Sequence, residues 1–307
     1  MGATPFRLIV YNRWIRGDYP VGKKEQDLLP GTQPKELISI RVTSFAREKA
    51  VLFRRVMLFL AGPSPWQERL RVFLADLQHE CEDVYLFGGA VRDWMIFGSR
   101  FVPRDLDVVV SGGDMTRLRD RFQSLIRRQN RFGGLRLSVA GFPIDLWELS
   151  DTWAIREGFV QDFSVQGLVR TAFLNLDAVA FRYGREASPH AIEQAGFFDA
   201  VSQRLLELNL EAAPSPAHCI VHALALAEKT GYDIGPKLLA YIVRHAECVV
   251  NELETIQQQR FGFIRYDQEH FLAWLERAQN PHLASIPFNL QRSTQMDLCD
   301  RLENQVF

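Results

Sequence analysis

The chain has 307 residues, a formal net charge of −1 and 47% hydrophobic residues. This length allows two domains or one domain with an extension, and the near-zero charge excludes a global basic field, so any nucleic-acid surface must be local. No apolar run approaches the ~20 residues that span a membrane, and the N-terminus lacks a signal-peptide pattern. The four scattered cysteines predict reduced thiols in a cytoplasmic protein.

The first part of the chain is predicted to form two strands and then two helices. Strands are expected at 6–11 and 37–42, where apolar and β-branched residues gather. Helices are expected at 45–61 and 65–80, and the second helix follows a capping box that begins at Ser64.

A strand, a glycine turn and a helix are predicted next. The apolar segment 84–87 is predicted to form a strand. Gly88 and Gly89 follow it, and a helix is predicted to begin near Ala90. Glycines allow close approach of a ligand to the backbone, and the amides at a helix N-terminus attract phosphate. This segment therefore predicts a phosphate-binding turn.

Two carboxylates lie on the strand that follows. Asp105 and Asp107 are two residues apart, so their side chains point to the same face of a strand. The valine run 108–110 indicates that this strand is central, where carboxylates without partners are costly. Carboxylates hold hard divalent cations that also touch substrate phosphates. The turn and the acid pair together predict a site for a magnesium-bound nucleoside triphosphate.

These motifs resemble those of a known family. The pattern Gly-Gly-x-Val-Arg-Asp over 88–93, combined with Asp-x-Asp over 105–107, is similar to the head domain of class II CCA-adding enzymes and bacterial poly(A) polymerases. These families belong to the DNA polymerase beta nucleotidyltransferase superfamily. The close match covers roughly residues 85–110, and a looser match continues to about residue 239.

The resemblance implies an α/β head, in which helices flank a mixed sheet, followed by an all-helical neck and body. The expected division is an N-terminal extension over 1–63, a head over 64–212 and the helical part over 213–307. The implied activity is nucleotide transfer from an NTP to an acceptor, most plausibly the 3′ end of a tRNA-like RNA, with two Mg²⁺ ions. Alternatives are transfer to a protein or small molecule, and an inactive nucleotide- or RNA-binding module. No membrane partner is expected, and the sequence leaves the oligomeric state open.

A third catalytic acid is expected at Asp145. Aliphatic residues flank it in a predicted strand over 142–149, so alternation puts the acid on the opposite face from them. With Asp105 and Asp107 it would form the set of catalytic residues and metal ligands. The alternative is an ordinary exposed strand acid.

Other residues are candidates for contacts with the nucleotide, together with Gly88 and Gly89. The resemblance implies that Arg92 and Asp93 help to hold it, although Asp93 would favour the helix N-terminus without any ligand. Arg104 could contact phosphate or form a salt bridge to Asp105. Further along, residues 173–181 resemble the family segment R-D-F-T-I-N-A-L-A-Y.

In that segment Asp177 stands where the family has asparagine, and Phe173 stands where it has aspartate. Asn175 and Asp177 are candidates for contacts with ribose or triphosphate. Gly196 to Asp199 resembles the next short strand of the family.

Seven arginines lie between residues 117 and 136, against one acid, Asp120. They suggest either a contact strip for phosphate or RNA or a solvated helix face, and we favour the second interpretation. A helix is expected over 115–129, followed by a strand over 134–140.

The C-terminal part is predicted to be helical, at 216–230, 236–250, 251–260, 267–279 and 290–305. Ser215 is a good N-cap for the first of these helices. The family begins this helix with E-D-x-x-R, whose side chains read C and A, whereas this chain has Pro214, Ser215 and His218. The chain is therefore predicted not to be a standard CCA-adding enzyme. His218 is a candidate for a contact with the base; metal binding by His218 and His222 is disfavoured.

Overall fold

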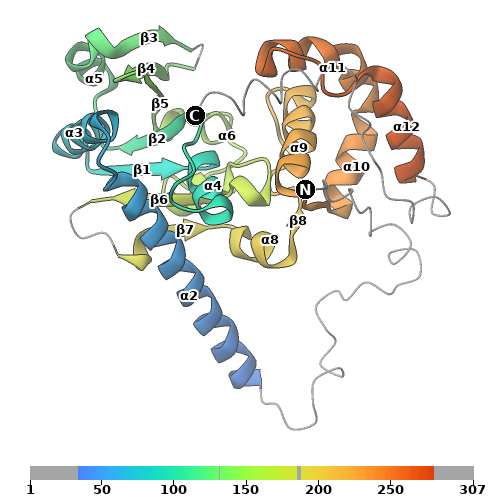
Figure 1. Ribbon diagram of the computed structural model, residues 1–307, viewed down its shortest axis with the longest axis horizontal. Coiled ribbons are helices and arrows are strands. Elements are labelled where there is room, and N and C mark those ends of the chain that lie inside the picture. Colours follow the sequence, from blue (N-terminus) through green and yellow to red (C-terminus); the bar gives the residue numbers. More distant parts are fainter. Residues whose placement is uncertain (1–33, 131, 185–187, 280–307) are drawn as a thin grey trace. The chain divides into compact units, whose positions relative to one another are not determined.

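The computed structural model describes residues 34–130, 132–184 and 188–279 (Figure 1). Two compact units divide the chain. One holds the described residues up to 203 together with 208–212, and the other holds 204–207 and the described residues from 213 onward. The strand expected at 6–11 and the helix expected at 290–305 lie outside the described residues.

A seven-stranded sheet forms the centre of the first unit. Its strands are β1 (Asp83–Phe87), β2 (Leu106–Ser111), β3 (Ile126–Gln129), β4 (Leu135–Val139), β5 (Phe142–Glu148), β6 (Val179–Tyr183) and β7 (Ile192–Gln194). Their order is β3-β4-β5-β2-β1-β6-β7. The central pair β2 and β5 is parallel, and the other neighbours are antiparallel. The sheet is therefore mixed, which confirms the fold class predicted for the head.

Helices and short 3-10 turns connect the strands. The helices are α2 (Pro34–Leu60), α3 (Pro65–Glu80), α4 (Gly89–Phe97), α5 (Met115–Arg121), α6 (Trp153–Arg156), α7 (Val165–Arg170) and α8 (Phe197–Gln203). The 3-10 turns are η2 (Gln123–Leu125), η3 (Leu149–Asp151), η4 (Asn175–Asp177) and η5 (Pro189–Ala191).

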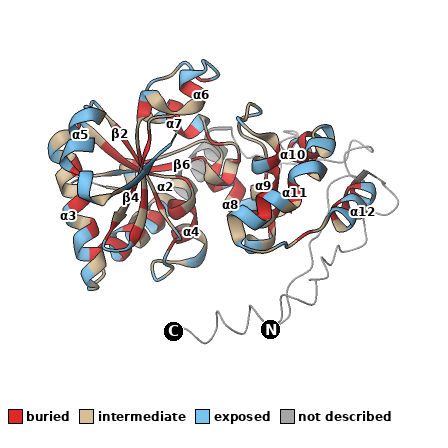
Figure 2. Cartoon of the chain, turned by 90° about the horizontal axis from the view of Figure 1, so that it is seen from above, coloured by how far each residue is buried: buried red, intermediate tan, exposed pale blue. Residues whose placement is uncertain are grey.

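One face of the sheet is apolar and covered by α2, α3 and α4. Alternation along the strands directs fully buried aliphatic side chains to this face, among them Leu86 and Val108. The Phe59 ring of α2 lies 4.4 Å from that of Trp94 in α4, measured between ring centroids. Figure 2 shows the buried residues concentrated along the strands between the flanking helices. Each such large side chain stabilises the fold by about 1.5–3 kcal/mol.

The opposite face is apolar at one end and polar at the other. Tyr85 and Val109 face each other across β1 and β2 and share a buried cluster with Ile155 of α6 and Leu168 of α7. Further along the same face, this alternation brings the side chain of Asp107 to the surface of the sheet, two residues from Val109. The short helices therefore cover one end of this face and leave the acidic end partly exposed.

Three predicted elements of the first unit are wrong. Residues 37–42 lie within α2 and not in a strand; because helix propagation is cooperative, the strong helix formers that follow carry the helix through β-branched residues. The helix expected over 115–129 ends at Arg121, and 126–129 form the edge strand β3, which pairs with β4. Residues from Phe197 form the helix α8, and the short strand before them is β7.

The second unit is mainly helical. Its helices are α9 (Pro216–Thr230), α10 (Pro236–Arg244), α11 (Ala246–Phe261) and α12 (Gln268–Gln279). A short parallel pair joins β8 (Leu205–Leu206) and β9 (Asp233–Ile234). The bounds predicted for α9 are confirmed, and the Ser215 side chain accepts a hydrogen bond from the His218 amide as the predicted cap. The helix expected over 236–250 is interrupted at His245.

Among the described helices of both units, none combines the length and the hydrophobicity needed to cross a lipid bilayer.

Candidate active site

A row of paired residues crosses the sheet at its polar end. Phe87 of β1 lies opposite Asp107 of β2, Asp107 lies opposite Asp145 of β5, and Asp145 lies opposite Arg136 of β4. Residues opposite each other in neighbouring strands face the same side of a sheet. The structure thus places Asp145 on the same face as Asp107. Asp105 lies directly before β2 and not within the strand.

Two arginines contact the carboxylates. Both terminal nitrogens of Arg136 lie 3.3 Å from Oδ2 of Asp105, and the same guanidinium forms an ion pair with Asp145. Arg104 approaches Asp105 to 3.1 Å from the solvent side, with 66% of its side chain exposed. The salt bridge considered for Arg104 is therefore present, and its contact with phosphate stays a prediction.

The acids repel one another at this site. Burial, followed by the negative charges of Asp105 and Asp145, raises the pKa of Asp107 from 3.8 to about 7. Burial also raises the pKa of Asp145, although the guanidiniums of Arg136 and Arg128 act in the opposite direction. The charged form of Asp107 is therefore disfavoured beside the other acids, and an added cation would relieve this repulsion.

The donor chemistry of the three acids suits a hard divalent cation, because all the available ligands are carboxylate oxygens. Within the described part of the chain, however, no three acidic, histidine or cysteine side chains are already arranged to hold a metal ion. The Arg136 guanidinium forms ion pairs with both Asp105 and Asp145. A cation at these oxygens would compete with this arginine.

The glycine turn begins where β1 faces the acids. Gly88 follows Phe87, the residue opposite Asp107, and its backbone has φ +64° and ψ −122°. Only glycine adopts this conformation without strain. The Gly88 amide donates to the Val179 carbonyl at 2.9 Å, and α4 starts at Gly89. The first amides of α4 have no partner within the helix and are available to an anion.

We predict that the two glycines respond differently to substitution. Gly88→Ala should lower the free energy of unfolding by about 1–3 kcal/mol, because alanine is strained at this φ. Gly89→Ala should stay within about 1 kcal/mol of the wild type, since the added Cβ would meet Arg92 at an ordinary 3.5 Å. Urea unfolding midpoints provide the comparison, and equal midpoints for the two variants would refute the prediction.

Arg92 is part of a buried ion-pair network beneath the turn. Its Nε lies 2.9 Å from Oδ1 of Asp93, and its guanidinium also pairs with Asp177 of η4. Arg92 is 6% exposed and Asp93 is 4% exposed. The structure thus brings these three predicted residues together and ties η4 to α4. Their contact with a nucleotide stays a prediction.

The remaining candidates lie elsewhere. Asn175 opens η4, close to Gly196. His218 lies in α9 of the second unit, where Nδ1 is 2.9 Å from the Ser215 hydroxyl. Nδ1 of His222 is 2.9 Å from the guanidinium of Arg260, so His218 and His222 have separate partners. The contact expected between His218 and a base stays a prediction.

Sequence reasoning missed Arg136 as a member of the site. The alternation Leu135-Arg136-Leu137 in β4 shows which face the arginine occupies. That signal does not identify its partners, because Asp105 is 31 residues away in the chain.

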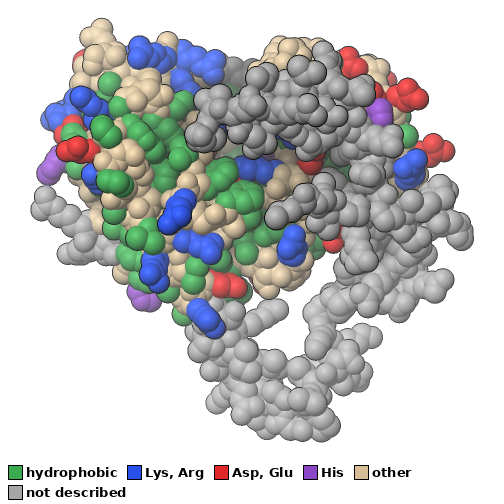
Figure 3. Space-filling view, in the orientation of Figure 1, with side chains coloured by type: hydrophobic (Ala, Val, Ile, Leu, Met, Phe, Trp, Pro, Cys, Tyr) green, Lys and Arg blue, Asp and Glu red, His purple; other side chains and the backbone are tan. Residues whose placement is uncertain are grey.

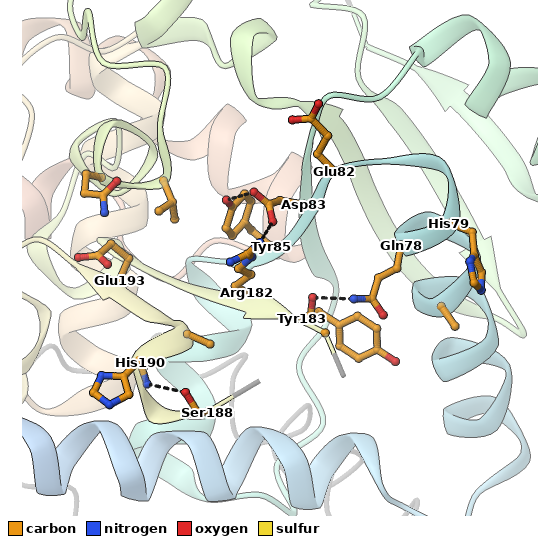
Figure 4. Close-up of a pocket in the computed structure, with 15 residues that line it drawn as sticks. Gln78, His79, Glu82, Asp83, Tyr85, Arg182, Tyr183, Ser188, His190 and Glu193 are labelled. Atoms are coloured by element: carbon orange, nitrogen blue, oxygen red, sulfur yellow. Dashed lines mark hydrogen bonds and ion pairs between the residues drawn. The ribbon is translucent and has the colours of Figure 1, made fainter. Parts of the chain in front are cut away.

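A separate cavity of about 700 Å³ lies at the other end of β1. Figure 4 shows Asp83 at its centre, between the Tyr85 hydroxyl and Arg182. Asp83 begins β1, whereas the acids of the candidate site face the last residue of that strand. The cavity and the acid cluster are therefore distinct places on the sheet.

Comparisons with known proteins bear on the fold. No family model matches the sequence, and no curated protein does. The structure is similar to that of a CCA-adding enzyme from Thermotoga maritima complexed with tRNA, with a TM-score of 0.52 and 15% identity over 81% of this chain and 60% of that one. It is also similar to an apo CCA-adding enzyme, with a TM-score of 0.52 and 15% identity over 73% of this chain and 53% of that one.

A CCA-adding enzyme with bound CTP is similar as well, with a TM-score of 0.50 and 16% identity over 81% of this chain and 58% of that one. The chain thus spans between about half and three fifths of the lengths of these proteins. At these identities the likeness shows that the fold is shared.

Proposed function

We propose that this chain is a metal-dependent nucleotidyltransferase that transfers nucleotides from an NTP to an acceptor, and that the acceptor is the 3′ end of a tRNA-like RNA. One observation carries the proposal. The glycine turn and the N-terminus of α4 begin one residue past the point where β1 faces Asp107, and Asp107 is in register with Asp145. A backbone turn suited to phosphate and a set of carboxylates are thus adjacent.

Each part has a role in this proposal. The amides after Gly88 and Gly89 hold the triphosphate, and Arg104 reaches its oxygens from the solvent side. Asp105, Asp107 and Asp145 are the metal ligands and catalytic residues. Magnesium bound there would activate the attacking hydroxyl and stabilise the leaving pyrophosphate, with two ions in the full arrangement.

The network beneath the turn supports the site without reacting. Arg92 holds Asp93 and Asp177 under the glycine turn, so it fixes the start of α4 relative to η4. Preorganised backbone amides stabilise charge without reorganising during the reaction. The shared fold with nucleotidyltransferases that bind tRNA or CTP supports RNA and NTP as the partners.

The test is incubation of the full chain with each labelled NTP, magnesium and total RNA. Products are separated on a gel that distinguishes labelled RNA from labelled protein. Label in RNA that depends on magnesium supports the proposal. Label in protein would support the alternative acceptor, and no label with any NTP would favour an inactive binding module.

The same assay with a tRNA that lacks its terminus tests selectivity. Pro214, Ser215 and His218 stand where the resembled family keeps two acids and an arginine, and His218 already contacts Ser215. Base selection needs fixed donors and acceptors, and each mispaired buried group costs roughly 1–3 kcal/mol. We predict weak discrimination among NTPs, or preference for one of them. Ordered addition of C, C and then A would contradict this prediction.

A further inference from the structure

The structure separates the arginines between residues 117 and 136 into groups with different surroundings. Arg117 and Arg121 of α5 form ion pairs with Glu80 and Asp76 of α3, at 3.0–3.2 Å. Arg136 contacts the acids of the candidate site. These three arginines are thus held by charges of the protein itself.

Two further arginines have no such partner. Arg127 and Arg128 lie on β3, where both are exposed, and neither forms an ion pair with any residue that the structure describes. Their strand is the edge of the sheet. Figure 3 shows basic side chains gathered over the region of β3. We call these two residues the β3 arginine pair.

The pairing of strands makes this edge unusual. Arg128 lies directly opposite Arg136 of β4, and like charges opposite each other destabilise a sheet. Asp105 and Asp145 form ion pairs with Arg136, whereas Arg128 forms no ion pair with a described residue and acts on Asp145 through the field of its charge. The register also shifts between Ile126 and Arg128, and bulges of this kind re-aim side chains. The edge thus presents positive charge that an anion would balance.

The order of the strands indicates which anion reaches this edge. In phosphoryl transfer the attacking and leaving oxygens lie roughly in line. If the triphosphate lies on the glycine turn after β1, as in the proposed function, an acceptor that reaches the acids from the side away from this turn approaches over β5, β4 and β3. Strands are ~4.8 Å apart, so the backbone of Arg128 lies about 10 Å beyond that of Asp145.

We propose that the β3 arginine pair binds backbone phosphates of the acceptor RNA strand, just upstream of its reacting 3′ end. The direction of approach rests on the proposed function. The exposed guanidiniums suit phosphate oxygens, to which arginine binds with two hydrogen bonds. Neither side chain contacts the reacting atoms, so the pair positions the acceptor.

The test measures RNA binding without turnover. The variant Arg127→Gln/Arg128→Gln and the wild type are titrated with a short fluorescent single-stranded RNA over a series of salt concentrations. We expect several-fold weaker binding at low salt, and a plot of log K against log salt that is shallower by about 0.7 for each lost contact. NTP affinity should be unchanged.

Two control variants sharpen the test. Arg119→Gln removes an equally exposed arginine from α5 and should leave RNA affinity unchanged. Arg127→Lys/Arg128→Lys keeps both charges and should keep most of the salt dependence, which distinguishes a charge effect from damage to β3.

Wild-type RNA affinity and salt slope in the glutamine variant would overturn the inference, even if the enzyme transfers nucleotides to RNA. Loss of NTP affinity with unchanged RNA affinity would also overturn it, because the pair would then serve the triphosphate. Weaker RNA binding supports the inference even if no transfer activity is found, so its failure and that of the proposed function are distinguishable.

Discussion

Replacing Asp107 by asparagine is expected to abolish nucleotide transfer and to stabilise the metal-free protein at neutral pH. The proposed loss of a metal ligand removes stabilisation of the transition-state charge, so activity should fall by at least ~10²–10³-fold. Asp105→Ala should have a similar effect on activity. Full activity in either variant would exclude the proposed mechanism.

The stability effect follows from the pKa of Asp107, which is about 7 in the folded chain against an ordinary 3.8. Between these values the folded protein binds more protons than the unfolded chain, so the stability of the metal-free protein falls as pH rises. This loss of folding stability is complete above about pH 7 and amounts to roughly 2–4 kcal/mol. Asparagine carries no charge, so the Asp107→Asn variant does not show this loss.

Thermal unfolding in EDTA at about pH 5 and pH 8 provides the measurement. The wild type should lose stability between these two conditions, and Asp107→Asn should lose less. If Asp107→Asn has the same melting temperature as the wild type at both pH values, the carboxylates do not repel one another as the structure indicates. Added magnesium should raise the wild-type melting temperature more than that of the variant.

Among the substitutions discussed, Arg92→Met should lower the free energy of unfolding the most. Burial lowers the pKa of the Arg92 guanidinium, but the carboxylates of Asp177 and Asp93 outweigh it and raise the pKa. Arg92 therefore stays charged. Methionine keeps the buried apolar stem but removes the guanidinium that pairs with the two carboxylates, and breaking a buried ion pair in this way costs about 3–5 kcal/mol.

The expected fall in melting temperature is roughly 10 °C for a chain of this size. Arg104→Gln is the matched control, because that side chain is 66% exposed, and an exposed ion pair contributes less than about 1 kcal/mol. The double variant Arg92→Met/Asp177→Asn should recover part of the loss, since only one charged carboxylate then remains. Equal melting temperatures for Arg92→Met and Arg104→Gln would show that the buried network is not stabilising.

Local patterns in the sequence determined much of the fold. The alternation around Asp145 predicted the face on which the structure places it, and the glycines at 88 and 89 predicted the turn before α4. Ser215 and the pattern after it predicted α9 to the residue. These features depend on neighbours in the chain, through strand periodicity, glycine conformation and helix capping.

Tertiary structure decided the features that depend on distant partners. Residues 126–129 become a strand because β4 is available to pair with them, and residues 37–42 continue a helix whose later turns pack on the sheet. Intrinsic preference is too weak to settle either segment. Sequence alone could not assign Arg136 to the acids of the candidate site, because the sheet brings β4 beside β5 and next to the start of β2. The balance of charges in the site thus depends on the order of the strands in the sheet, and local sequence patterns do not determine that order.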